Sequence, residues 1–147
     1  PKMSTKEKQE KLIQNMRKWQ KVETQTIKQA AEIMEKTDNP LVLLVMEIIQ
    51  RDSAIHHRVQ KLIADSLEEK TIPVTFEDLG NIWELIEQHT EIEKGIESLA
   101  KESLEAIKGS RNVIQEYLLT YLMEDEKKHD NLLTNLGLIK KGMYGSG

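Results

Sequence analysis

The sequence contains no cysteine, only three prolines and seven glycines, and 4% aromatic residues. Without cysteine the chain cannot form a disulfide scaffold, a thiolate zinc site or a cysteine-ligated iron–sulfur cluster, and it has no cysteine nucleophile. The scarcity of turn-forming and strand-forming residues favours helices. Any metal site in this chain must therefore be built from histidine and carboxylate side chains.

Long apolar runs and blocks of one charge sign are also missing. The longest apolar run, residues 41–46, is far shorter than the ~20 residues of a membrane span. The N-terminus lacks the charged-then-apolar pattern of a signal peptide, so we expect a cytoplasmic protein with no membrane contact. A net charge of −4 with both signs interspersed leaves no basic stripe, and we expect no nucleic-acid partner.

What the sequence does contain is a set of helix signals. The 147-residue length suits one domain with a single core. Ser4 and Glu7 form a capping box, and Asn39-Pro40 is typical of a helix start. With Thr75 as a third start and Gly137 as a final stop, the predicted helices span residues 4–36, 40–68, 75–107 and 111–136. The expected fold is an all-α four-helix bundle.

The two halves of the chain are related by an internal repeat. A shift of 73 residues superposes Asp52 on Asp125 and His56 on His129, and it keeps the apolar positions in register. We therefore predict two copies of one helical hairpin.

The apolar face of each predicted helix is interrupted once by polar residues, because positions three and four apart share a face. These residues are, helix by helix, Gln20 and Glu23; Asp52 or Ser53 with His56; His89 and Glu93; and Glu126 and His129. Buried charges cost several kcal/mol each unless they are paired or coordinated. Four such interruptions at one level of a bundle favour a shared explanation, a bound cation.

At these residues the sequence resembles the ferritin-like di-iron carboxylate family, especially its rubrerythrin and bacterioferritin branches. In that family a Glu on helices 1 and 3 and a Glu-x-x-His on helices 2 and 4 hold two irons. Glu93 stands 33 residues before Glu126, and Glu126 with His129 forms the Glu-x-x-His of the fourth helix. The resemblance implies a ferritin-like fold with the metal inside the bundle.

The first half of the chain departs from the family pattern. Gln20 and Ser53 stand where the family has glutamates, and only His56 remains of the expected ligands. Glu23, one turn beyond Gln20, and Asp52, beside Ser53, are possible replacements on the same faces. The site is accordingly a remodelled dimetal centre, a mononuclear centre or a degenerate relic.

The complete set of candidate metal ligands is Glu93, Glu126, His129, His56, His89, Glu23 and Asp52. The resemblance does not supply His89, which either binds the metal, orients a ligand or is a core histidine. Carboxylates with imidazoles suit Fe, Mn or Zn. The resemblance implies iron, two ions if the site is complete, and an oxidoreductase of the ferroxidase or peroxidase type that reacts with O₂ or peroxide.

Two further alternatives stay open at this point. The chain is either such a metal protein, with homo-oligomers possible, or a non-catalytic structural or interaction protein whose buried polar layer is metal-free. The missing glutamates at Gln20 and Ser53 favour the second reading. A short connector at 69–74 favours an up-down-up-down path, whereas earlier helix ends would permit the long crossover of the ferritin-like family.

Overall fold

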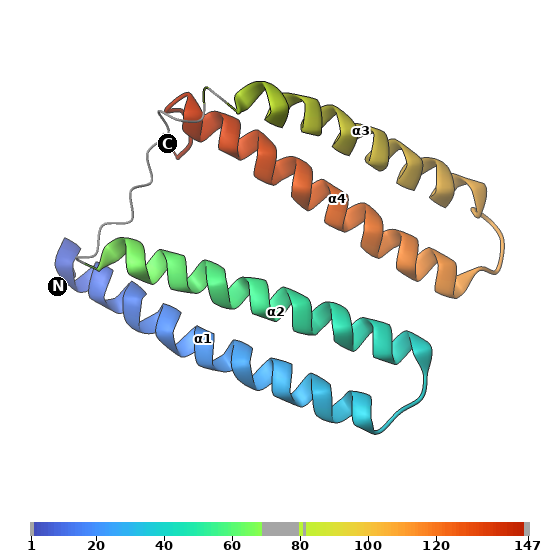
Figure 1. Cartoon of the computed structure of the whole chain (residues 1–147), viewed down its shortest axis with the longest axis horizontal. Helices are drawn as coiled ribbons and strands as arrows, with labels where there is room; N and C mark the ends of the chain where they lie inside the picture. Colours follow the sequence, from blue (N-terminus) through green and yellow to red (C-terminus); the bar gives the residue numbers. More distant parts are fainter. Residues whose placement is uncertain (1, 69–79, 81, 146–147) are drawn as a thin grey trace. The chain divides into compact units, whose positions relative to one another are not determined.

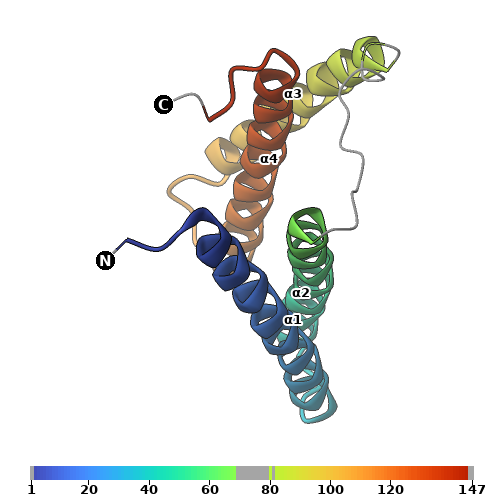
Figure 2. The same cartoon turned by 90° about the vertical axis from the view of Figure 1, so that its left-hand side faces the viewer.

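The computed structural model describes residues 2–68, 80 and 82–145, and it contains no strand among them. Four helices are present: α1 (Thr5–Glu35), α2 (Pro40–Leu67), α3 (Trp83–Ala106) and α4 (Val113–Lys140). α1 packs beside α2 as an antiparallel hairpin, and α3 packs beside α4 as a second one (Figure 1 and Figure 2). The all-α fold class with two helical hairpins is thus confirmed. None of these helices is both long and apolar enough to cross a membrane.

The hairpins follow the period of the sequence repeat. The chain divides into two compact units, Pro1–Pro73 and Val74–Gly147. α2 and α4 have the same length, 28 residues, and both their first and their last residues are 73 positions apart (113 − 40 and 140 − 67). The repeat found in the sequence is therefore a repeat of the fold. The single domain expected from chain length stays a prediction.

The first hairpin is defined by the predicted caps. The Ser4 side-chain oxygen accepts a hydrogen bond from the Glu7 backbone N–H at 3.2 Å, as a capping box requires. Asn39 accepts from the N–H groups of Leu41 and Val42 at 2.9 and 3.2 Å, and Pro40 occupies the first position of α2. These caps satisfy helix-end donors that would otherwise lack partners.

The expected stop of the fourth helix at Gly137 is wrong, because α4 continues to Lys140. A Cβ atom placed on Gly137 would meet the Trp83 indole at 3.5 Å, so the helix backbone passes close to this ring. The Lys140 ammonium lies 4.7 Å from the centre of the same ring and stabilises the last turn. The turn that ends the helix uses Gly142, whose φ of 69° is one that glycine adopts without strain.

The third helix begins later than predicted in the described part of the chain. Its first residue is Trp83, and the expected start at Thr75 lies outside the described residues. The connector predicted at 69–74 lies outside them as well, so the path from α2 to α3 stays a prediction. α2 ends at Leu67, within one residue of its expected end.

The interior of the hairpins is unusually polar. The buried apolar residues are Met16, Ala30, Ala64, Ala100 and Met123. An equal number of buried residues are polar or charged: Gln20, Glu23, Ser53, Gln60 and Glu93. Small alanines let the paired helices approach closely. Because buried polar groups are costly without partners, the positions of these five residues decide what each hairpin can do.

Candidate metal centre

Three predicted ligands converge on the α3–α4 hairpin. α3 contributes Glu93, and α4 contributes Glu126 and His129, one turn apart on the face that meets α3. The Nδ1 atom of His129 lies 3.5 Å from Oε2 of Glu93 and 3.6 Å from Oε2 of Glu126. One donor atom from each residue falls within 4.8 Å of the other two. The predicted convergence of these three side chains is therefore confirmed, and their role as metal ligands stays a prediction.

The two carboxylates of this cluster are removed from solvent. The Glu93 side chain is 9% exposed and that of Glu126 is 15% exposed. Oε2 of each has no hydrogen-bond donor in the described structure. The contact between the two carboxylates, together with burial, raises the pKa of Glu126, while the same contact lowers the pKa of Glu93. Ionising both carboxylates at once is therefore unfavourable unless a positive charge lies between them.

Asp125 lies near the second ring nitrogen of His129. Its Oδ2 lies 3.4 Å from Nε2, whereas Nδ1 is the nitrogen nearest the two glutamates. With a proton on Nε2 toward this carboxylate, the ring would present its Nδ1 lone pair to Glu93 and Glu126. Imidazole is held in this way in many metal sites.

His89 does not join the cluster as a second donor from α3. Its Nε2 forms a 3.0 Å hydrogen bond with Oε1 of Glu93, while Oε2 of Glu93 faces His129. The two histidines therefore contact different oxygens of one carboxylate. Of the roles left open by the sequence, the structure places His89 where it orients Glu93.

The geometry of the three donors fits a small cation. At 3.5 and 3.6 Å, the His129 contacts are too long for good hydrogen bonds. Ligands about 2.1 Å from a tetrahedral ion lie about 3.4 Å from one another. A transition-metal ion between these atoms would thus satisfy both carboxylate oxygens that lack a hydrogen-bond donor.

The α1–α2 hairpin brings together fewer of its predicted ligands. Nδ1 of His56 lies 3.6 Å from Oε2 of Glu23, which is buried and has no hydrogen-bond donor. The His56 side chain is 57% exposed, compared with 38% for His129. Asp52 is half-buried and takes no part in this pair. Two donors are present here, and among the described residues only the α3–α4 cluster reaches three.

Sequence reasoning missed Arg17, which occupies the polar face of α1 beside Gln20. Its guanidinium donates to Oε1 of Gln20 at 3.1 Å and to the carboxylates of Asp65 and Glu68 at 2.9 and 3.0 Å. Gln20 in turn donates to the backbone carbonyl of His57 at 3.3 Å. The three-residue spacing from Arg17 to Gln20 on one helix face was the available signal.

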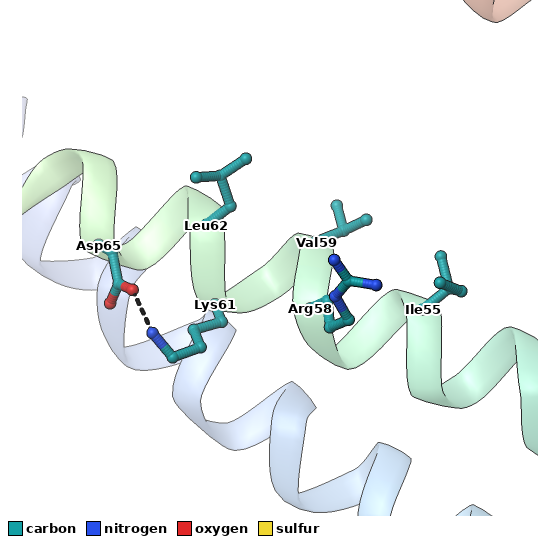
Figure 3. A pocket seen from close by; sticks show the side chains of 6 residues that line it. All are labelled: Ile55, Arg58, Val59, Lys61, Leu62 and Asp65. Atoms are coloured by element: carbon teal, nitrogen blue, oxygen red, sulfur yellow. Dashed lines mark hydrogen bonds and ion pairs between the residues drawn. The ribbon is translucent and has the colours of Figure 1, made fainter. Parts of the chain in front are cut away.

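A shallow groove on α2 is less suited to binding a cation than the α3–α4 cluster. Ile55, Val59 and Leu62 form an apolar stripe along it, and Lys61 bonds Asp65 at 2.6 Å (Figure 3). The one carboxylate in the groove is thus neutralised by a lysine, and Arg58 adds a second positive charge. The groove has neither an unpaired carboxylate nor an imidazole to bind a metal.

Comparison with known proteins identifies no family for this chain. No protein-family model, curated protein or solved structure matches the chain significantly.

Proposed function

We propose that the chain binds a divalent transition-metal ion through Glu93, Glu126 and His129. The observation that carries the proposal is the convergence of His129 Nδ1 on two buried carboxylate oxygens that lack hydrogen-bond donors. Two buried carboxylates that face each other repel when both are ionised, and a cation between them removes that repulsion.

The donor set narrows the choice of metal. Two carboxylates and one imidazole suit Fe(II), Mn(II) or Zn(II), and no thiolate is available to favour softer ions. A narrower form of the proposal is an iron-dependent oxidoreductase that reacts with O₂ or peroxide. That form rests on the resemblance to the ferritin-like di-iron carboxylate family. In it, His89 and Asp125 would keep Glu93 and His129 oriented while the metal changes its charge.

The competing proposal is a structural or interaction protein with a metal-free polar interior. Its support comes from the first hairpin, where Gln20 obtains partners from Arg17 and from the His57 carbonyl without any ion. The α3–α4 hairpin favours the metal instead, because Oε2 of Glu93 and Oε2 of Glu126 both lack such a partner and face the same imidazole.

The test is metal content after reconstitution. The metal-free protein is incubated with Fe(II) without oxygen, freed of excess metal and analysed for iron. We expect Glu126→Ala and His129→Ala to lose bound iron and the Lys127→Ala variant to keep it, because Lys127 is exposed on the same turn. Lys128 is a less suitable control, since it bonds Asp125 at 2.7 Å. Equal iron content in all three variants would rule out this site.

A further inference from the structure

We infer that the metal centre is mononuclear, with one ion held by α3 and α4 alone and none held by α1 and α2. This inference rests on the proposed metal-binding function and specifies its stoichiometry. The 73-residue repeat gives each proposed ligand a counterpart in the first hairpin. Gln20 corresponds to Glu93, Ser53 to Glu126 and His56 to His129 (differences of 73 residues).

Gln20, the counterpart of Glu93, already forms hydrogen bonds with other groups of the protein. The Gln20 amide donates from Nε2 to the His57 carbonyl and accepts at Oε1 from the Arg17 guanidinium. A metal ion at Oε1 would have to lie beside that guanidinium, and the two positive charges would repel. Gln20 is also neutral, so it would contribute no charge to compensate a second ion.

Arg17 places a fixed positive charge where a second ion would need a negative one. Asp65 and Glu68 bind its guanidinium and hold it against α2. The corresponding residue in α3 is Thr90 (17 + 73), a neutral side chain that bonds its own helix at the Ile86 carbonyl. The first hairpin therefore has an arginine at the level of its polar cluster, whereas the ion-pair contacts recorded for Glu93 and Glu126 in the second hairpin are with histidines.

The count of carboxylates leads to the same stoichiometry. Glu93 and Glu126 carry two negative charges when ionised, which match one divalent ion. At the counterpart positions Gln20 and Ser53 offer no charge. Of the two other candidate carboxylates in the first hairpin, Glu23 faces His56 with a buried oxygen, and Asp52 takes no part in that pair. A second buried divalent ion beside His56 would thus contact one carboxylate instead of two, which is energetically costly.

Three protein donors also leave the ion accessible. Structural sites for such metals commonly use four protein ligands, whereas sites that bind water or a substrate use three. The exposed fraction of His129, 38%, shows that solvent reaches this edge of the cluster. The single ion would thus keep at least one position for water or a small ligand.

The experiment is a titration of the metal-free full chain with Zn(II) by calorimetry in the presence of a competing chelator. We expect one tight ion per chain. Gln20→Ala and His56→Ala should keep that ion with a Kd changed by about twofold or less. Glu93→Gln and His129→Ala should weaken it on the order of 100-fold. Glu93→Gln preserves side-chain shape, and circular dichroism checks that every variant keeps its helices.

The possible outcomes distinguish the proposal of metal binding from the inference that the centre is mononuclear. Two tight ions per chain, or loss of the tight ion in His56→Ala, would overturn the mononuclear inference while leaving metal binding intact. Absence of tight binding to the unaltered chain would overturn both. One ion that depends on Glu93 and His129 and not on His56 would support both.

Discussion

Nδ1 of His129 on α4 lies 3.5 Å from Oε2 of Glu93 on α3, so two proposed ligands from different helices are in contact. The contact joins residues 36 positions apart, so it reports on the packing of the hairpin as well as on the site. Asp125 faces the other ring nitrogen of His129, and His89 binds the other oxygen of Glu93. Each member of this contact therefore has a second polar neighbour on its own helix.

The Asp125→Asn variant tests the orientation of His129. An amide can present its N–H to Nε2 and favour the wrong tautomer of the ring. We expect metal affinity to fall about tenfold without the loss of any ligand. The control is Glu124→Gln, which removes the same charge from the adjacent, exposed residue. Calorimetry measures the Kd of each variant. An equal loss of metal affinity in both variants would mean that net charge, and not the orientation of His129, causes the effect.

The acid stability of the first hairpin depends on Asp65. Lys61 and Arg17 donate hydrogen bonds to this carboxylate and hold its pKa below the ordinary value of 3.8. Because the folded state favours the ionised form, this stabilisation is complete above pH 3.8 and is lost as pH falls through the folded-state pKa. Asp65→Asn should therefore lower the Tm at pH 7, with the difference from the unaltered chain closing in acid.

The matched variant is Asp38→Asn, which changes an exposed carboxylate between α1 and α2. It should leave the Tm nearly unchanged at both pH values. A Tm difference for Asp65→Asn that persisted unchanged well below pH 3.8 would mean that packing, and not the ion pairs, causes the loss of stability.

Two glycines near the end of α4 should respond oppositely to alanine. Gly137 is inside the helix, and its new Cβ would make an ordinary 3.5 Å contact with Trp83, so Gly137→Ala should stabilise by about 0.5–1 kcal/mol. Gly142 has a φ of 69°, and Gly142→Ala should destabilise by about 1 kcal/mol. Thermal melts measure both changes. Shifts of the same sign would contradict the described end of the helix.

Helix positions and the second half of the site could be predicted from sequence because both depend on local rules. The helix start at Ser4 and the Asn39-Pro40 start each describe a single turn, and the structure confirms both as N-caps. Glu126 and His129 are one turn apart on one helix, so helical phase alone places them on one face. The predicted end of α4 was wrong because Gly137 lies inside the helix, where its backbone passes close to the Trp83 ring. No local sequence rule reveals that contact.

The first half of the site was harder to predict because its outcome depends on contacts between helices. Gln20 looked like a degenerate ligand, but Arg17 and the His57 carbonyl engage both ends of its amide. Such competition for a polar group is not visible in spacing, since the His57 carbonyl is backbone from another helix. The role of His89 was likewise undecided until its hydrogen bond to Glu93 was located.

The most direct test of metal binding at this cluster is the thermal unfolding of the full chain with a chelator and with added Zn(II) at neutral pH. An ion that binds only the folded state stabilises it by about 2.7 kcal/mol at a hundredfold excess over Kd, which corresponds to several degrees in Tm. We predict this increase for the unaltered chain and for Lys127→Ala, and its disappearance in His129→Ala. Superimposable melting curves of the unaltered chain with chelator and with metal would contradict the account.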